Sequence, residues 1–191
     1  RPIIKNAVLA WNIAFEEAGF IDAIEVKIQP DDADWSAGDI RYNVLRWTSS
    51  PNPPFGGYGP SFTNPRTGEI LGADIMLEWI YLTNRVRYSE IFENQEKLNN
   101  DFCQNSLLKQ ENRIFGKLAT EALDLNENEI SRLYEEDLYQ LILHEVGHTL
   151  GLNHNFAAST LHNNSDVHNP DITYKEGLSS SVMDYHALNI A

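Results

Sequence analysis

The stretch HEVGHTLGLNHN, residues 144–155, contains three of the six histidines in the chain. Consecutive residues of an α-helix are separated by about 100° around the helix axis. His148 therefore follows His144 by one turn and about 40°, so both imidazoles lie on one face and can bind the same metal ion. Glu145 lies about 100° from His144, at the flank of this face, where its carboxylate can reach a water on that ion.

The third histidine requires the helix to end. A continuing helix would carry His154 further along the axis and point it away from the other two. Gly151 tolerates the left-handed conformation that ends helices, so the chain can reverse there and bring His154 back. Three neutral imidazoles leave one coordination position open, as in catalytic rather than structural zinc sites. The alternative, surface histidines at a polar helix end, is disfavoured because HExxHxxGxxH is far more specific than HExxH alone.

Composition narrows the class of protein and its partners. The chain has 191 residues, 42% of them hydrophobic, which indicates one folded domain with a single core. Its net charge of −14 repels phosphate backbones, so no nucleic-acid partner is predicted. No run of about 18 apolar residues is present, so no membrane insertion is predicted. Cys103 is the only cysteine, which excludes an internal disulfide and predicts a buried or half-buried small hydrophobe.

The beginning of the chain has the pattern of one helix followed by strands. Apolar residues recur at helical spacing between a proline and a glycine, which predicts a helix over residues 3–18. Residues 23–29 and 41–47 alternate or run apolar as strands do, with an acidic loop between them. The Pro- and Gly-rich stretch 49–60 predicts an irregular surface loop.

A hairpin and a helical region are expected next. The runs GPSF (59–62) and EILGADIML (69–77), joined by TNPRTG, predict two short strands. Residues 81–126 are polar with helical apolar spacing, which predicts two or three helices that cap the domain; a partner-binding helix is the alternative. Asn126 and Glu129 form a capping-box pattern, so the helix that carries the histidines should begin near 127.

Two motifs together carry a resemblance to a known clan. The motif HExxHxxGxxH is followed by SVMDY, residues 181–185, with Met183 placed 29 residues after His154. This combination resembles the metzincin clan of zinc peptidases, in which the second motif is the Met-turn. Nearly all of the chain is similar to the metzincin-like peptidase domain of large multidomain bacterial proteins, although only these two motifs are specific. An arrangement like that of thermolysin, with a distant glutamate as third ligand, is disfavoured.

The resemblance implies an α+β fold. It implies a twisted mixed β-sheet with a backing helix and an active-site helix, above an irregular C-terminal subdomain that ends at the Met-turn. Residues 1–191 would form one domain, with an upper subdomain over 1–154, a helical insertion over about 81–126, and a lower subdomain over 155–191. The clan usually has a strand before the first helix and often a helix after the Met-turn, so we expect the chain to be part of a longer protein.

The resemblance also implies a reaction, the hydrolysis of peptide bonds by a zinc-dependent endopeptidase. Glu145 would be the general base that takes a proton from a metal-activated water. Catalysis would use one zinc ion. Its ligands would be His144, His148 and His154.

Four further residues lie in or next to the two motifs, and one of them differs from the usual metzincin sequence. Met183 would form an apolar floor beneath the imidazoles and is not a ligand. Tyr185 would bind the zinc or the oxyanion, as the tyrosine of astacins and serralysins does; the alternative is a tyrosine packed in the turn. Asp184 could brace the turn by hydrogen bonds. Asn155 departs from the Asp, Glu, Ser or Pro that follows the third histidine in the best-known families, which leaves substrate specificity open.

One strand resembles the edge strand beside the metzincin cleft, where an extended peptide can pair with exposed backbone. A solvent-facing edge without a ligand is the alternative. Calcium at Asp74 or at the acidic loop 31–39 is not supported, because the ligand spacing of a calcium loop is missing. The residues of the predicted edge strand are Leu71, Gly72, Ala73, Asp74, Ile75, Met76 and Leu77.

The remaining histidines are weaker candidates. His162, Asp166 and His168 could form a second metal site, but a polar loop is favoured because no regular element fixes their geometry. His186 could line the cleft, although this role is disfavoured.

Alternatives in function stay open. A catalytically silent or latent zinc-containing domain that only binds polypeptide is the rival of the endopeptidase, and the presence of Glu145 favours the enzyme. The expected partners are a protein or peptide substrate and flanking domains of a larger parent chain. By resemblance, we expect the chain to act outside the cytoplasm of a bacterium, secreted, periplasmic or at the cell surface.

Overall fold

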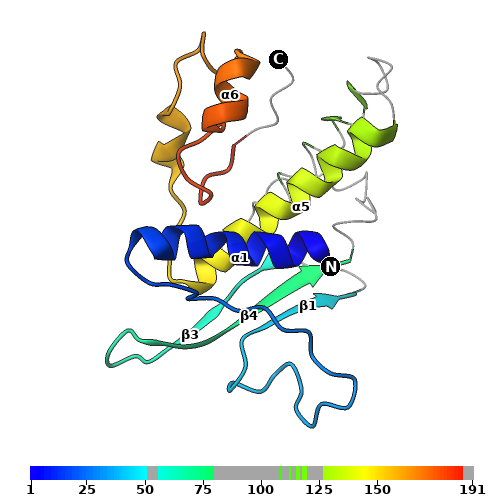
Figure 1. Ribbon diagram of the computed structural model, residues 1–191, viewed down its shortest axis with the longest axis vertical. Helices are drawn as coiled ribbons and strands as arrows, with labels where there is room; N and C mark the ends of the chain where they lie inside the picture. The colour runs from blue at the N-terminus through cyan, green and yellow to red at the C-terminus, as the bar shows by residue number, and fades with distance from the viewer. Residues whose placement is uncertain are drawn as a thin grey trace, which may run out of the picture.

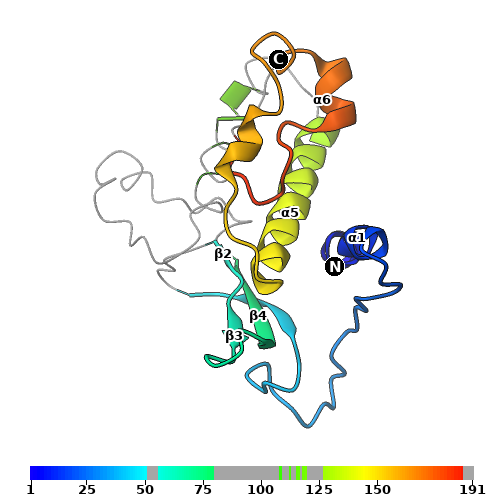
Figure 2. The same cartoon turned by 90° about the vertical axis from the view of Figure 1, so that its left-hand side faces the viewer.

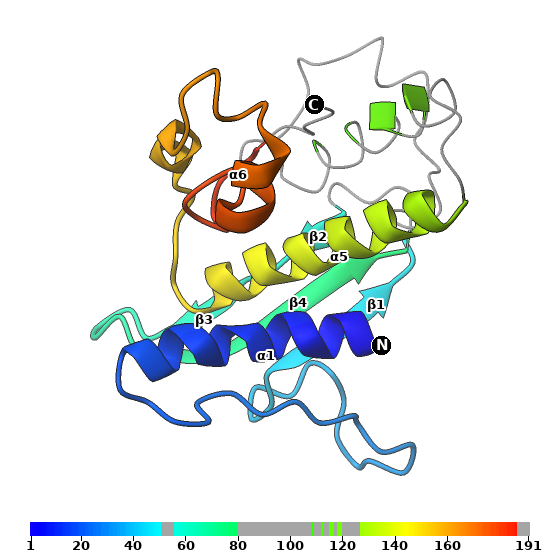
Figure 3. The ribbon, with the colours of Figure 1, turned by 45° about the horizontal axis from the view of Figure 1, so that its top comes forward.

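The molecule has a small mixed sheet covered by helices, with an irregular segment at the far end. In the computed structural model, the helix α5 lies over the sheet and α1 lies beside α5 (Figures 1 and 3). The short helices η2 and α6 lie at the opposite end of the molecule from the sheet (Figure 2). The structure describes residues 1–50, 56–79, 108, 112, 115–116, 118–119 and 127–186. The elements are α1 (Pro2–Glu17), β1 (Val44–Thr48), β2 (Gly57–Tyr58), β3 (Ser61–Thr63), β4 (Ile70–Glu78), α5 (Glu127–Thr149), η2 (Phe156–Thr160) and α6 (Pro170–Glu176).

The two predicted long helices are confirmed within one or two residues. α1 begins at Pro2, where proline's missing N–H is not needed, and Gly19 follows its end with φ of 90°. α5 begins at Glu127, as the capping-box pattern predicted, although Asn126 itself lies outside the described residues. Trp11 on α1 donates its indole N–H to the carbonyl of Leu143 on α5 at 3.2 Å, which fixes the two helices to each other.

The sheet is mixed, as the resemblance implied. β1 runs parallel to β4, from Val44 opposite Asp74 to Thr48 opposite Glu78. β2 and β3 run antiparallel to β4. The predicted hairpin is confirmed as β3 and β4, whose connection is closed by a hydrogen bond from Asn64 N to Glu69 O at 2.8 Å.

The expectation of an edge strand at residues 71–77 is wrong, because β4 is paired on both sides. β1 lies on one side of it, and β2 and β3 lie on the other. The side chains of a strand predict that it is half-buried, but they do not reveal which strands are its neighbours. The stretch 49–60, predicted to be irregular, contains β2, and β2 takes an outer position in the part of the sheet that the structure describes.

The prediction of a strand over residues 23–29 is also wrong. Ile24 instead pairs with a side chain of α1: Asn12 Nδ2 donates to Ile24 O at 2.9 Å, and Ile24 N donates to Asn12 Oδ1 at 2.8 Å. No neighbouring strand pairs with this segment in the described sheet, and Ile28 is 72% exposed. The second predicted strand, 41–47, is present as β1 and begins three residues later.

The core lies between the two long helices and β4. Each large aliphatic side chain buried there stabilises the fold by about 1.5–3 kcal/mol. This packing fixes the half of α5 that ends in the histidine motif. The buried core residues are Ala7, Ile75, Leu77, Leu138, Leu141, Ile142 and Val146.

The predicted helices over 81–126 and the prediction for Cys103 fall almost wholly outside the described residues. Among the described helices, none combines the length and apolar character needed to cross a bilayer.

Candidate metal centre

The C-terminal half of α5 places His144 and Glu145 in the interior. Both side chains are fully buried, with 0% exposure. Glycines in β2 and just after it let the backbone lie against α5 at Glu145. A Cβ atom on Gly57 would lie 3.1 Å from Glu145 Oε1, and one on Gly59 would lie 2.5 Å from Glu145 O. These two glycines therefore allow the outer strand to lie directly against the predicted base.

The chain reverses after α5, as predicted from Gly151. This glycine has φ of 91°, in the left-handed region. Gly151 N donates to His148 O at 2.9 Å, and Leu152 N donates to Gly147 O at 3.0 Å. The reversal brings His154 back against the helix, where its Nε2 lies 3.1 Å from His148 Nε2.

Three imidazoles converge at this point. His144, His148 and His154 each offer one nitrogen, and these atoms all lie within 4.8 Å of one another. Two nitrogens that bind one tetrahedral zinc at 2.0–2.1 Å are about 3.3 Å apart. The separation of 3.1 Å between His148 and His154 is close to that value. Among the described residues this is the one group of histidine, cysteine or carboxylate side chains with metal-binding geometry.

Backbone carbonyls set the tautomers of the first two histidines. His144 Nδ1 lies 2.7 Å from Val182 O, and His148 Nδ1 lies 2.9 Å from Leu152 O. A carbonyl oxygen only accepts a hydrogen bond, so Nδ1 of each ring carries the proton and donates it. Each Nε2 then has its lone pair free for a metal, the arrangement that second-shell partners typically impose on histidine ligands.

The surroundings of His148 and His154 favour the neutral form of imidazole. Burial lowers the pKa of His148 below its ordinary value and outweighs the opposite effect of the hydrogen bond to Leu152 O. Burial likewise lowers the pKa of His154, and the neighbouring His148 lowers it further. Neutral imidazole is the ligand form, so these shifts favour metal binding at neutral pH.

The predicted Met-turn lies against α5. Met183 is 2% exposed, and its sulfur fills the space where a Cβ on Gly147 would be. Met183 O accepts a hydrogen bond from Asn155 N at 3.0 Å, which ties the turn to the chain just after His154. Met183 therefore contacts α5 at Gly147, the residue before His148. This placement fits the predicted apolar floor.

A buried aspartate connects the Met-turn to η2. Asp184 is 3% exposed and accepts hydrogen bonds from Ser159 Oγ at 2.6 Å, Ser179 Oγ at 2.7 Å and Tyr185 N at 2.8 Å. Burial alone would raise the pKa of Asp184, but these hydrogen bonds outweigh it and the pKa lies below its ordinary value. The role of Asp184 as a brace was predictable from the sequence, but its partners Ser159 and Ser179 were not, because only the fold brings them to it.

Tyr185 faces the third histidine. Its hydroxyl lies 2.8 Å from His154 Nε2, and the two rings are 4.6 Å apart. The hydroxyl is therefore beside the nitrogen that would bind the metal, within reach of the same ion. The role of Tyr185 at the metal and the alternative, a tyrosine packed in the turn, both stay predictions.

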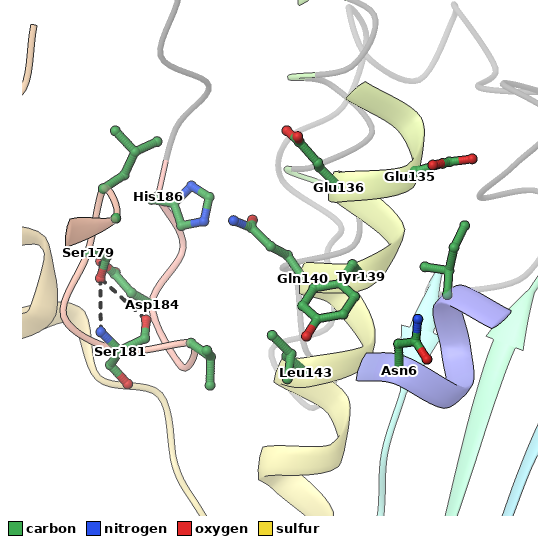
Figure 4. A pocket seen from close by; sticks show the side chains of 14 residues that line it. Asn6, Glu135, Glu136, Tyr139, Gln140, Leu143, Ser179, Ser181, Asp184 and His186 are labelled. Carbon is green, nitrogen blue, oxygen red and sulfur yellow. Dashed lines mark hydrogen bonds between the residues drawn. The ribbon is translucent and has the colours of Figure 1, made fainter. Parts of the chain in front are cut away.

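The other candidates are not part of this group. His162 Nε2 lies 2.7 Å from Gly177 O, and Asp166 bonds to Asn163 in the same loop. His186 lines a different cavity of about 550 Å³, between α1, α5 and the loop of the Met-turn (Figure 4). In Figure 4, Gln140 of α5 points across this cavity toward His186.

Comparison with known proteins supports the resemblance. Residues 126–191 match a protein family described as Met-zincin. The match begins next to the start of α5 and includes the three histidines, Glu145 and the Met-turn. The match supports a metzincin-like domain over the part of the chain that contains the histidines and the Met-turn. Neither a curated protein nor a solved structure matches the chain significantly.

Proposed function

We propose that this chain is a zinc-dependent endopeptidase that hydrolyses peptide bonds, with Glu145 as its general base. The observation that carries the proposal is the convergence of three imidazole nitrogens within 4.8 Å, two of them from a helix that also buries a glutamate next to the first histidine. A structural zinc site would use a fourth protein ligand, and among the described residues no further histidine, cysteine or carboxylate side chain joins this group.

The donor set fits zinc. Three neutral nitrogens suit a borderline-soft divalent ion, and the hydrogen bonds of His144 and His148 to backbone carbonyls orient two of the rings. When bound here, zinc would act as a Lewis acid on the scissile carbonyl and lower the pKa of a water to about 7.

The residues of the chain would supply the proton transfers and the positioning. Glu145 takes a proton from the attacking water at its carboxylate and passes it to the leaving amine. Gly57 lies against the carboxylate of Glu145 and Gly59 lies against its backbone, so both contacts limit the movement of this residue. The Tyr185 hydroxyl would donate a hydrogen bond to the substrate oxygen that gains negative charge, a role supported by its position 2.8 Å from His154 Nε2.

The setting proposed for this activity follows from the resemblance. The substrate would be a protein or peptide, and the chain would act outside the cytoplasm of a bacterium as one part of a longer protein. The alternative is a domain with the same zinc site that binds polypeptide without cleaving it.

The test combines metal analysis with cleavage of a mixed peptide library. We expect about one zinc per chain and cleavage that a chelator abolishes and added zinc restores. Glu145→Gln should lower kcat by about 10²–10⁴-fold, because the general base is lost while the three imidazoles remain. Glu135→Gln, at an exposed position on the same helix, is the matched control and should leave kcat unchanged. Zinc and peptide binding without any cleavage would instead identify a binding domain.

A further inference from the structure

The indole of Trp11, on α1, lies along one turn of α5. Its N–H donates to the carbonyl of Leu143 at 3.2 Å, and its Cζ2 atom lies 3.2 Å from the place that a Cβ on Gly147 would take. Residues 143 and 147 are about one helical turn apart. His144 and Glu145 lie between them in the sequence. One side chain of α1 therefore contacts both ends of the turn that carries the first histidine and the proposed base.

The same glycine is the point where the Met-turn contacts α5. Gly147 is buried, and the sulfur of Met183 fills the place that its Cβ would take. Trp11 of α1 and Met183 of the Met-turn thus pack against one residue that has no side chain of its own. Protein interiors are close-packed, so a change in the indole alters the space that the methionine fills.

The Met-turn also holds the first histidine. Val182, the residue before Met183, accepts the hydrogen bond from His144 Nδ1 at 2.7 Å. Partners of this kind orient a histidine ligand and fix its tautomer. A shift of the Met-turn along α5 would strain this hydrogen bond. Trp11 is therefore connected to His144 by two routes, through the turn 143–147 and through the Met-turn.

We propose that Trp11 is a positioning residue for the metal centre, which holds the turn 143–147 and the Met-turn in the relative position that zinc binding requires. The inference rests on the proposed function, since it concerns how that zinc site is held. It assigns α1 a part in metal binding, although α1 lies outside residues 126–191 that match the family. If Trp11 only packed α1 on α5, it would affect zinc affinity no more than other residues of that interface.

Zinc affinities of variants on α1 separate these two roles. Trp11→Ala should raise the Kd for zinc by about 10-fold or more, as changes in the partners of metal ligands do. Ile4→Ala is the matched control, because Ile4 packs on the same core from α1 about two turns before Trp11. Its zinc Kd should stay within about 2-fold of wild type, since a metal-free chain that remains mostly folded binds zinc with full affinity. Competition with a chelator of known affinity measures Kd, and urea denaturation of the metal-free chains compares their stability.

Trp11→Phe provides a test if the alanine variant does not fold. It keeps an aromatic ring and removes the N–H that bonds to Leu143 O, so its zinc Kd should rise by about 3-fold or more. A zinc Kd in Trp11→Phe equal to that of Ile4→Ala would overturn the positioning role and leave the proposed function intact. A wild-type chain that binds no zinc would overturn the metal centre and this inference together. Zinc binding without peptide cleavage, with the Trp11 effect present, would overturn the endopeptidase alone.

Discussion

Two segments hold the functional end of α5, and they do so by opposite means. The segment of Gly57 and Gly59 lies against Glu145 because it has no side chains there. The Met-turn is held in place by a buried carboxylate, Asp184, which gathers Ser159, Ser179 and the N–H of Tyr185. The first contact depends on excluded volume and the second on hydrogen bonds to a charge, so the two should respond differently to substitution.

The largest loss of stability and activity is expected at Gly59, where the chain lies against the backbone of Glu145. In Gly59→Ala the new Cβ would lie 2.5 Å from Glu145 O, a distance that one of the two segments must relieve by moving. We expect a loss of about 3 kcal/mol in the free energy of unfolding, as for overpacked cores. Moving the general base by about 1 Å would also lower kcat by about 100-fold. Urea denaturation and peptide cleavage measure the two effects.

Gly38→Ala is the control for that variant, since a Cβ on Gly38 meets nothing within 4 Å. Its stability should stay within about 0.5 kcal/mol of the wild type. A Gly59→Ala chain with wild-type stability and cleavage would show that the segment after β2 does not constrain Glu145.

A smaller effect is expected at the Met-turn. Asp184→Asn keeps the shape of the side chain but removes the charge that accepts the hydrogen bonds from Ser159 and Ser179. Hydrogen bonds to a charged group contribute about 1.5–3 kcal/mol, so we expect the free energy of unfolding of the metal-free chain to fall by about 2 kcal/mol. Asp166→Asn is the matched control, because Asp166 accepts similar bonds from Asn163 and Ser165 in an exposed loop. Equal losses in both variants would contradict a special role for the buried brace.

The same contrast explains how much the sequence predicted. His144, Glu145 and His148 share one helix, and Gly151 reverses the chain next to them, so local geometry brings the histidines together without knowledge of the fold. Ser159 reaches Asp184 across 25 residues, a contact that depends on how η2 packs on the Met-turn. Spacing rules describe the first kind of contact and contain no information on the second.

The sheet shows the same limit. The hydrophobic pattern predicted β4 almost to the residue, but its neighbours come from residues 44–48 and 57–63 in an order that no local pattern specifies. The strand expected over 23–29 does not form. The side-chain amide of Asn12 bonds instead to the backbone N–H and C=O of Ile24. An asparagine on the adjacent helix gives no sign of this role in the sequence.

The smallest effect, and one that depends on pH, is expected at a buried carboxylate on the sheet. Glu78 on β4 is 2% exposed and accepts hydrogen bonds from Thr48 Oγ1 at 2.7 Å, Ser50 Oγ at 2.7 Å and Ser50 N at 3.0 Å. Burial alone would raise the pKa of Glu78, but the bonds from Ser50 and Thr48 outweigh it and the pKa lies below its ordinary value. Glu78 is therefore tightly buried, like the contact at Gly59, and is also a hydrogen-bonded charge, like Asp184.

The direction of its pH dependence follows from that shift. Because the folded chain holds the Glu78 proton more weakly than the unfolded chain, its contribution to stability is complete above the unfolded pKa and is lost as the pH falls through the folded pKa. Glu78→Gln should cost about 1–2 kcal/mol at pH 7, and the difference from wild type should shrink below about pH 4. Exposed Glu69 provides the control Glu69→Gln, which should not change the pH profile of urea denaturation. A difference between Glu78→Gln and wild type that stayed constant down to pH 2 would mean that shape, and not charge, stabilises this corner of the sheet.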